Sequence, residues 1–392
     1  MQNHSFDETP SLGIYIHIPF CRHRCAYCDF NTYTSLSDMK DVYASALCQE
    51  IVQVAGTQTR AASTVFFGGG TPSLMRPTAI GKILDTTRRA FRLDAGAEIT
   101  MEVNPGSVDE AYLAAVRAHG VNRLSFGVQS ANASELALLE RSHDFETVIQ
   151  VVSQSRAAGF DNINLDLIYG LPDQSLASWE HSLKAALDLE PEHLSLYCLI
   201  IEPGTRMQRW LKTGQVPAPD PDLAADQYDL SGKMLAEAGF EHYEISNWSR
   251  PGKACRHNLI YWRNQEYLGF GAGAHGHAAG SRYSVVKQPR VFVRRMELGA
   301  PEHYPLSAAV AEHYRLSRSE QMADTVITQL RLLREGLDLP AFSAKFGQPF
   351  EQVYNGTVQQ MMEWGLLRKS QDSLRLTQKG AFLSNQVFYR FI

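Results

Sequence analysis

Short hydrophobic runs alternate along the first half of the chain with longer segments of amphipathic, helical spacing. Six of these runs predict strands, because they are rich in β-branched and aromatic residues and end at glycine, proline or polar turns. The runs cover residues 14–18, 64–67, 98–103, 123–128, 163–168 and 193–197. They begin about 25 to 50 residues apart, which leaves room for the crossover helix that parallel strands require. The pattern therefore predicts an α/β fold with a (β/α)6 series.

The segments between the runs have the spacing of helices, and two of them stop at a glycine, which commonly ends a helix. The predicted helices cover residues 41–54, 78–91, 109–118 and 145–158. Three prolines between residues 215 and 221 then interrupt the pattern. Because proline cannot continue a helix, we expect a domain boundary near residue 214.

The remainder of the chain is less regular. A helix is expected over 222–237 and a short strand near 243–245, followed by a glycine- and histidine-rich stretch. From about residue 306 the pattern is helical, and it ends in two short strands that resemble the wing of a winged-helix unit. The predicted parts are a flexible N-terminus, a barrel, a middle α+β section and a C-terminal helical, winged-helix-like domain, over residues 1–11, 12–214, 215–305 and 306–392.

Charge and hydropathy narrow the classes of partner. The 37 Lys and Arg residues against 42 Asp and Glu give a net charge of −5, so bulk electrostatics do not favour nucleic acid, and we expect none despite the wing. The first ten residues lack the pattern of a signal peptide, and no apolar run has the length of a membrane span. We therefore expect a cytoplasmic protein without a transmembrane segment; peripheral membrane contact and a homodimer stay open.

Six cysteines are too few for a disulfide scaffold, yet three of them, Cys21, Cys25 and Cys28, fall on one loop after the first strand. Three thiolates with the spacing C-x3-C-x2-C can hold three irons of a [4Fe–4S] cluster and leave the fourth iron open. A zinc site completed by His23, or three unrelated thiols, are the alternatives. Cys48 and Cys198 lie in apolar segments and are expected in the core.

Polar or glycine residues follow several of the predicted strands. A triple glycine ends the second strand, and Glu102, Gln129 and Asp166 end later ones, with Arg141 shortly after a helical turn. Because the carboxyl ends of parallel strands meet at one mouth, these residues are expected to line a ligand site there. Taken singly, each could instead cap a helix, form a turn or pair with a surface charge.

The cysteine spacing, with Tyr27 before the third cysteine, resembles the radical S-adenosylmethionine superfamily. The motifs HIPFC, FGGGTP, EVNP, FGVQS and DLIYGLP resemble the branch that holds oxygen-independent coproporphyrinogen III oxidases and HemW-type haem chaperones. The resemblance implies a partial (β/α)6 TIM-like radical-SAM barrel, one [4Fe–4S] cluster on the three cysteines and an exchangeable S-adenosylmethionine that chelates the open iron. It assigns to S-adenosylmethionine the residues Tyr15, Tyr27, Gly69, Gly70, Thr71, Glu102, Gln129, Arg141 and Asp166.

Two features distinguish the members of this branch. The oxidases carry a fourth cysteine two positions after the third and a long N-terminal extension, whereas this chain has Phe30 there and about 13 residues before the first strand. The motif HNLIYW resembles the one that marks the haem chaperones, and it implies haem contact by His257, Tyr261 and Trp262. Imidazole is a good axial ligand for haem iron, although a lone histidine is more often a hydrogen-bonded core residue.

Further candidate haem ligands are His275, His277 and Cys255, and the chain has no Cys-x-x-Cys-His motif for covalent c-type attachment. The resemblance therefore implies a chaperone that binds haem and transfers it to an acceptor haemoprotein. A coproporphyrinogen oxidase-like enzyme and a radical enzyme acting on an unknown substrate are the alternatives. The sequence assigns no catalytic residue.

Overall fold

The computed structural model describes residues 12–56, 60–300 and 303–392, so the predicted flexible N-terminus lies outside the described residues. Within these ranges a twelve-stranded sheet has the order β12-β11-β10-β9-β1-β2-β3-β4-β5-β6-β8-β7. Six consecutive parallel strands form its centre, at the six positions that the hydrophobic runs predict. They are β1 (Leu12–Ile18), β2 (Ala62–Gly69), β3 (Leu93–Val103), β4 (Arg123–Gln129), β5 (Ile163–Tyr169) and β6 (His193–Cys198).

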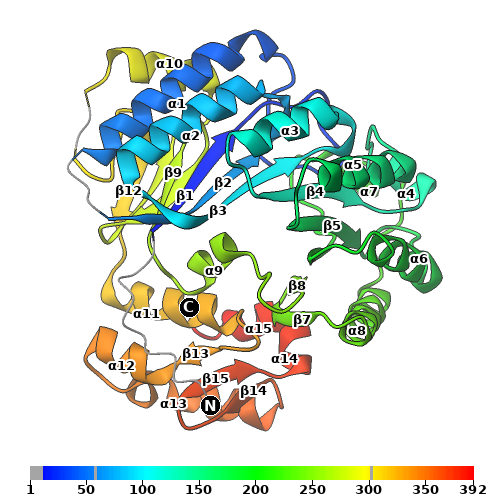
Figure 1. Cartoon of the computed structure of the whole chain (residues 1–392). Helices are drawn as coiled ribbons and strands as arrows, with labels where there is room; N and C mark the ends of the chain where they lie inside the picture. Colours follow the sequence, from blue (N-terminus) through cyan, green and yellow to red (C-terminus); the bar gives the residue numbers. More distant parts are fainter. Residues whose placement is uncertain (1–11, 57–59, 301–302) are drawn as a thin grey trace.

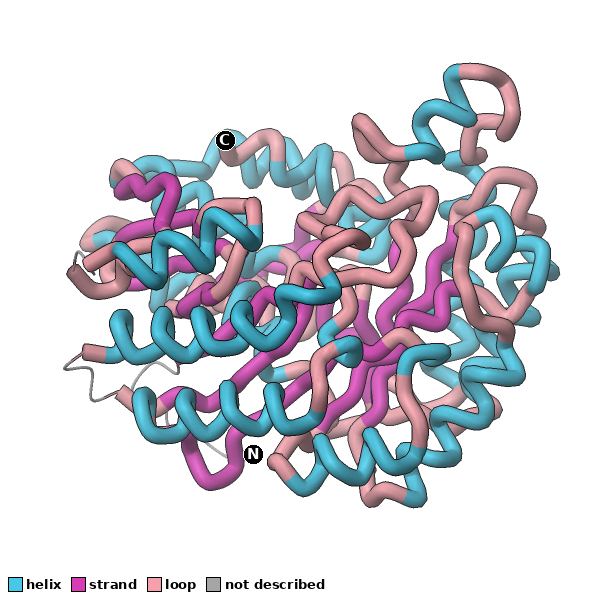
Figure 2. Tube along the Cα trace, turned by 90° about the horizontal axis from the view of Figure 1, so that it is seen from above, coloured by secondary structure: helices cyan, strands magenta, loops and turns pink. Residues whose placement is uncertain are grey.

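Helices cover the outer side of these strands, and Figure 2 shows the strands at the centre with helices around them. Two helices begin at aspartate caps: Asp109 accepts a hydrogen bond from Tyr112 N at 2.8 Å, and Asp144 accepts one from Thr147 N at 2.9 Å. The four helices expected from the sequence are confirmed. The helices of this part are α1 (Lys40–Ala55), α2 (Pro77–Phe91), α3 (Glu110–Ala118), α4 (Ala133–Leu138), α5 (Phe145–Ala157), α6 (Leu176–Leu187) and α7 (Arg206–Lys212).

The middle section adds strands to both sides of the parallel core. After α8 (Pro221–Glu237), β7 (Glu241–Glu244) and β8 (Asn247–Ser249) continue the sheet next to β6. The glycine- and histidine-rich stretch continues it on the other side, where β9 (Tyr267–Phe270) pairs in parallel with β1. β10 (His275–Ala278) and β11 (Ser281–Val285) follow in antiparallel order.

The helical expectation from residue 306 onward is wrong for one segment. After α10 (Pro289–Leu298), residues Val310–Arg315 form β12, which pairs with β11 at the edge of the sheet. The backbone hydrogen bonds with β11 stabilise an extended strand here, although the spacing of hydrophobic residues in this segment favours a helix. The exposed charged residues Glu312 and Arg315 are of the kind that protects an edge strand from pairing with another chain.

The C-terminal part is helical with a small sheet, as expected. β14 (Leu367–Lys369) and β15 (Ser373–Leu376) form the predicted antiparallel pair, and β13 (Leu337–Asp338) joins it. α9 (Arg256–Trp262) lies between this part and the large sheet (Figure 1). The helices here are α11 (Arg318–Leu330), α12 (Leu339–Phe346), α13 (Phe350–Glu363), α14 (Gln378–Phe382) and α15 (Ser384–Phe388).

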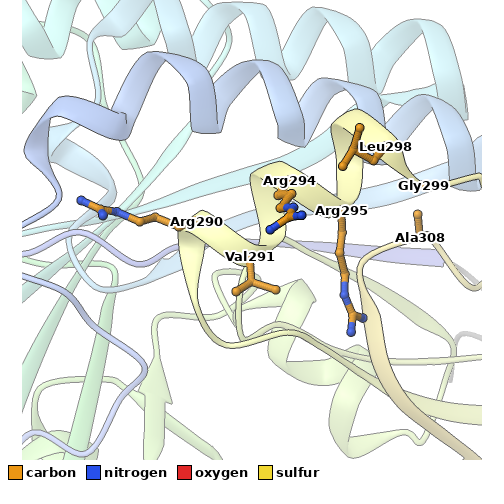
Figure 3. A pocket seen from close by; sticks show the side chains of 7 residues that line it. All are labelled: Arg290, Val291, Arg294, Arg295, Leu298, Gly299 and Ala308. Carbon is orange, nitrogen blue, oxygen red and sulfur yellow. The ribbon is translucent and has the colours of Figure 1, made fainter.

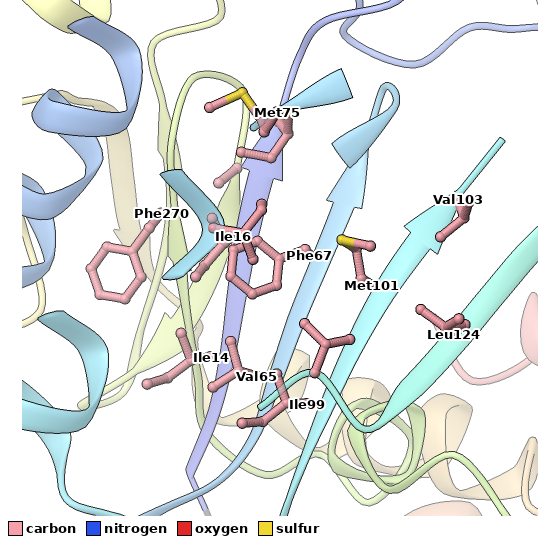
Figure 4. Close-up of a cluster of buried hydrophobic side chains, with 14 of the residues drawn as sticks. Ile14, Ile16, Val65, Phe67, Met75, Ile99, Met101, Val103, Leu124 and Phe270 are labelled. Atoms are coloured by element: carbon pink, nitrogen blue, oxygen red, sulfur yellow. The ribbon is translucent and has the colours of Figure 1, made fainter. Parts of the chain in front are cut away.

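The largest hydrophobic core lies between the sheet and its outer helices, and a separate core fills the C-terminal part. Alternate side chains of the central strands, such as Ile14, Val65 and Met101, point into the larger core (Figure 4). The intervening side chains face the barrel interior, where the register places Phe66 beside Thr100 and Thr100 beside Arg123. The interior is thus partly polar. Within the described ranges, no helix combines the length and apolarity needed to span a bilayer.

Candidate functional site

A pocket at the carboxyl ends of the parallel strands brings together the residues that the sequence assigns to the cluster and to S-adenosylmethionine, with the exception of Tyr15. Strand ends from β2, β3, β4 and β5 contribute to it, together with the loop after β1. The predicted residues that line it are Cys21, Cys25, Cys28, Tyr27, Gly69, Gly70, Thr71, Glu102, Gln129, Arg141 and Asp166.

The cysteine loop is held to its neighbours by backbone hydrogen bonds. Cys21 N donates to Tyr33 O at 3.1 Å, and Cys28 N donates to Cys25 O at 3.2 Å. Ala26 is fully buried, donates to Leu139 O at 3.3 Å and accepts from Met207 N at 2.9 Å. These contacts join the loop to the segment after α4 and to α7, and so fix the turn that carries the thiols against the rest of the barrel.

The chemistry of the three thiols fits a cluster better than a single ion. Among the described residues, no three or more His, Cys, Asp or Glu side chains converge as ligands of one metal ion. Thiolates that hold a [4Fe–4S] cluster bind different irons and need not converge. Burial raises the pKa of the Cys21 and Cys28 thiols, so a bound metal would have to favour their deprotonation.

His23, the fourth ligand of the zinc alternative, faces other partners. Its Nε2 lies 3.2 Å from Arg206 Nη2 and 3.7 Å from Glu140 Oε2. Cys48 and Cys198 do not line the pocket. Cys198 is exposed rather than in the core, because it ends β6 where the strand leaves the sheet, and Cys48 is half-buried.

Two partly buried carboxyl groups, those of Glu102 and Asp166, line the pocket and give it its electrostatic character. Gly69 N donates to Glu102 Oε2 at 3.1 Å, while burial, followed by the charge of Asp166, raises the pKa of Glu102 to about 8. Asp166 accepts from Asn164 Nδ2 at 2.7 Å and from Ser125 Oγ at 3.2 Å, and burial raises its pKa as well. Two neighbouring carboxyl groups that repel each other favour a cationic ligand, which S-adenosylmethionine would be.

Arg141 supplies the opposite charge and an unused donor. Its Nη2 donates to Gly127 O at 2.7 Å and its Nη1 to Cys25 Sγ at 3.5 Å, whereas its Nε is buried without a partner. A buried donor without a partner fits an acceptor from a ligand, such as a carboxylate. Gln129 lies beside it at a bulge of β4, with φ of 72°.

Two residues of the triple glycine lie so close to neighbouring atoms that a side chain would not fit at either position. A Cβ on Gly70 would lie 2.7 Å from Phe20 O and 2.9 Å from Ile18 O, so a side chain there would collide with the backbone that leads into the cysteine loop. Gly69 has φ of 112°, and a Cβ on it would lie 2.5 Å from the His17 ring. Without side chains at these positions β2 can approach the end of β1, and both glycines also line the pocket, as the sequence predicts.

Tyr15 lies deeper in the barrel than the pocket. Its hydroxyl is 3.0 Å from His17 Nδ1, and its ring stacks on Phe66 with centroids 6.2 Å apart. The charge of Glu102 acts on the Tyr15 hydroxyl, whose pKa is raised first by burial. Tyr15 thus lies behind Glu102, between the pocket and α9.

His257 is buried in the interior rather than exposed to a ligand. Its Nδ1 is 2.7 Å from Thr64 Oγ1 and its Nε2 is 2.8 Å from Tyr261 OH, so both ring nitrogens are paired. Burial, followed by the charge of Arg123, lowers the pKa of His257 to about 3, which leaves the imidazole neutral. The ring is in the protonation state that binds iron, but in this conformation it has no free nitrogen.

The other haem candidates are spread over α9 and the sheet edge. Trp262 packs under the guanidinium of Arg331, whose carbon is 4.3 Å from the ring centroid. Cys255 is buried and donates to Glu98 at 3.6 Å. His275 is exposed and His277 half-buried on β10. The structure therefore does not gather these residues around one exposed surface.

A polar network between the pocket and α9 was missed from the sequence. Asn164 donates to Asp166 and lies 2.6 Å from His193 Nδ1, and His193 Nε2 is 2.8 Å from Tyr243 OH. Cys255 N donates to the same hydroxyl at 3.4 Å. The alternation of polar residues in the fourth to sixth strands was the available signal, since every second residue of an inward-facing strand shares one side.

Comparisons with known proteins agree with this architecture. Residues 15–186 match the model of the Radical SAM superfamily, and residues 316–383 match the HemN C-terminal domain. The Heme chaperone HemW of Bacillus subtilis is 35% identical over 96% of this chain and 98% of its own length. The Heme chaperone HemW of Mycobacterium tuberculosis is 38% identical over 96% of this chain and 93% of its own length.

A solved structure of Escherichia coli coproporphyrinogen III oxidase (HemN), described as a radical SAM enzyme, superposes with a TM-score of 0.84 at 26% identity. The alignment covers 97% of this chain and 90% of that one. The superfamily implies a [4Fe–4S] cluster and S-adenosylmethionine, and the thiols, the carboxyl pair and the unpartnered Arg141 Nε fit both. On the sequence identity over almost the whole chain, this protein belongs to the HemW family of the radical SAM superfamily.

Proposed function

We propose that this protein is a haem chaperone that binds haem and transfers it to an acceptor haemoprotein. The observation that carries the proposal is the 35% identity to the Bacillus subtilis Heme chaperone HemW over 98% of that protein. We further propose that Cys21, Cys25 and Cys28 hold one [4Fe–4S] cluster and that S-adenosylmethionine binds exchangeably beside it. The cluster would supply an open iron for the ligand and an electron for its reduction.

The residues around the thiols have distinct roles in this proposal. Glu102 and Gly70 lie near the amino end of S-adenosylmethionine, and Arg141 offers its free Nε to the carboxylate. Gln129 and Asp166 contribute to ribose and carboxylate binding, while Thr71, Gly69 and Tyr27 border the cluster and the ligand. The protein's part is to bind and orient S-adenosylmethionine, because the partly buried Glu102, Arg141 and Asp166 line the pocket together.

Haem contact by His257, Tyr261 and Trp262 belongs to the same proposal. Since both nitrogens of His257 are paired, iron can reach the ring only after the bond to Thr64 or to Tyr261 opens. The neutral imidazole supports such a role chemically. His275, His277 and Cys255 are the alternative ligands, and the exposed His275 needs no rearrangement.

A second function, porphyrinogen decarboxylation, deserves a test because the solved oxidase shares the fold. The residue at the position of the oxidases' fourth cysteine is Phe30, whose side chain is 61% exposed at the rim of the pocket. Phenylalanine cannot ligate a metal, which favours the chaperone.

The first experiment is anaerobic purification followed by iron, sulfide and haem analysis. We expect about four irons per chain and a Soret band on haem addition. Replacing Cys21, Cys25 or Cys28 with Ser should remove the iron, whereas Cys198→Ser, a thiol outside the pocket, should retain it. Zinc without iron–sulfur absorption would contradict the cluster.

The second experiment measures transfer and turnover. Haem-loaded protein should restore the spectrum of a haem-depleted haemoprotein from the same cells, faster than free haem does. Incubation with coproporphyrinogen III, reductant and S-adenosylmethionine should give no substantial protoporphyrinogen. Turnover of that substrate would defeat the chaperone proposal, and cleavage of S-adenosylmethionine stimulated by a defined non-haem molecule would favour a different radical enzyme.

A further inference from the structure

The outer face of α10 carries an unusual pattern of side chains, shown in Figure 3. Val291, Arg294, Arg295 and Leu298 recur at helical spacing, with Arg290 one turn before Arg294. The opposite face of the helix, formed by Phe292, Val293 and Met296, is buried in the core next to α1. The exposed stripe therefore reads apolar, cationic, cationic, apolar, and it is not needed to hold the helix in place.

The stripe surrounds a hollow of about 560 Å³, which Gly299 and Ala308 complete. Leu298 is 75% exposed and Val291 37% exposed. Figure 3 places Arg294 and Arg295 between these two side chains, and Ala308 faces the end of the helix from the segment before β12. We call these seven residues, 290, 291, 294, 295, 298, 299 and 308, the α10 surface. It lies apart from the cysteine pocket, because the two share no residue.

The positive charges of the α10 surface are uncompensated in the described part of the chain. Arg290 and Arg294 form no hydrogen bond or ion pair there through their side chains, and Arg295 donates only to Val310 O, at 2.9 Å. Glu297 lies on the same helix but forms no ion pair with them. Other exposed arginines in the described part of the chain are of both kinds: Arg76 pairs with Asp41 at 2.6 Å and Arg263 with Glu335 at 2.8 Å, whereas Arg315 and Arg368 have no side-chain partner.

The charge and the apolar side chains of the α10 surface indicate which kind of ligand it would bind. The three guanidinium groups form a local cluster of positive charge on a protein of net charge −5, and guanidinium groups bind carboxylates well. The exposed aliphatic side chains beside the hollow would be buried by an apolar side chain of the ligand. A helix that lies on a membrane needs a continuous apolar face, with its cations on the other face. Here the continuous apolar face is already buried, and the guanidinium groups interrupt the outer one. The pattern favours a protein segment over a bilayer.

We propose that the α10 surface is a docking site for an acidic segment of a partner protein, one that presents carboxylates between two apolar side chains. The carboxylates bind Arg290, Arg294 and Arg295, and an apolar side chain enters the hollow between Val291 and Leu298. The proposal does not depend on haem binding or on the cluster, so it can fail or succeed independently of the proposed function.

The test uses the full chain and a fluorescent helical peptide whose outer stripe reads Leu-Glu-Glu-Leu at the spacing of Val291, Arg294, Arg295 and Leu298. Anisotropy should show binding that weakens as salt is raised. R290E/R294E should weaken it at least tenfold, and V291S/L298S should weaken it without changing the charge. All four positions are exposed, so both variants should keep the melting temperature of the parent.

The matched control is R315E/R368E, which makes the same charge change at two exposed arginines outside the α10 surface and should bind the peptide as the parent does. A peptide with Lys in place of Glu should not bind. Equal losses in both charge-reversal variants would overturn the docking site, since only net charge would then matter. Binding to phosphatidylglycerol vesicles without binding to the peptide would overturn it in favour of a membrane surface.

Discussion

Glu50 is a carboxyl group in a place that disfavours its charge. It is 1% exposed on α1, where it accepts from Gly271 N and from Ser307 Oγ, each at 2.7 Å, and so joins α1 to two distant loops. Burial raises its pKa to about 7. Between pH 4.5 and 7 the Glu50 carboxyl therefore keeps its proton in the folded protein and loses it in the unfolded chain. Because the unfolded state binds fewer protons in this range, the free energy of unfolding decreases as pH rises from about 4.5 to 7.

We therefore predict that Glu50→Gln stabilises the protein at pH 8 and changes little at pH 4.5, because glutamine keeps the hydrogen bonds without the charge. The difference between the two pH values should be about 3 kcal/mol in the free energy of unfolding, from the size of the pKa shift. Urea denaturation of the parent and the variant at both pH values measures it. An equal effect at both pH values would contradict the role of ionisation.

His257 and Tyr261 give a second prediction at this scale. If iron binds Nε2 of His257, Tyr261→Phe removes the hydroxyl that occupies this nitrogen while it keeps the aromatic ring, so haem affinity should rise several-fold. His257→Ala should lose the corresponding part of the affinity and change the Soret band. Haem titrations of both variants, with Tyr267→Phe as the control, measure these changes in affinity. Unchanged affinity in both variants would make His257 a member of the interior hydrogen-bond network only.

At the scale of elements, α9 depends on one side chain from β3. Glu98 accepts from Arg256 N and His257 N, both at 3.0 Å, so its carboxylate satisfies the first donors of the helix. Arg123, which is 2% exposed, is an electrostatic neighbour of this carboxylate. Removing Glu98 would leave the two helix donors without their acceptor and would take a negative charge from the neighbourhood of the buried Arg123 guanidinium.

Glu98→Ala should therefore lower the free energy of unfolding by about 3 kcal/mol, because two buried backbone donors lose their acceptor and a buried guanidinium loses a neighbouring negative charge. Glu98→Gln, which keeps one acceptor oxygen, should cost less. Chemical denaturation measures both, and Glu110→Ala, at an exposed position of α3, is the control. A loss no larger than that of the control would show that water replaces the carboxylate without cost.

The elements also show what the sequence could predict. The six central strands and their helices follow from periodicity, because each has its own hydrophobic run and helix ends marked by caps or glycine. β9, β10 and β12 are short and rich in glycine or charge, and they are strands because distant partners supply their ladders. The triple glycine, Glu102, Gln129 and Asp166 could be predicted from their places at strand ends, whereas Tyr27 and Thr71 were assigned through the family resemblance. The pairing of both His257 nitrogens could not be predicted, since it depends on Thr64, far away in the sequence.

At the scale of the whole molecule, the two large hydrophobic cores are separate. Leu374, fully buried on β15, belongs to the C-terminal core, and Val65 on β2 belongs to the core of the large sheet. Leu374→Ala should lower the stability of the C-terminal part by about 2 to 5 kcal/mol, the typical cost of such a cavity.

Calorimetry should then show a separate, earlier transition in Leu374→Ala, while the transition of the large sheet keeps its temperature. Val65→Ala should lower the temperature of the large-sheet transition instead. A single transition that moves equally in both variants would show that contacts across α9 and α11, such as Arg263 with Glu335, make the molecule one cooperative unit.

The position of β1 between β2 and β9 has a consequence for synthesis. The strand that leads into the cysteine loop is synthesised before both of its neighbours in the sheet, and one of its two edges remains unpaired until residues 267–270 have been made. Until then the nascent barrel presents an open parallel edge, which is a template for pairing with another chain. A chain that stopped before Tyr267 would contain all three cysteines but would lack β9, which pairs with the free edge of β1. We therefore expect premature termination to yield aggregates rather than a smaller cluster-binding protein.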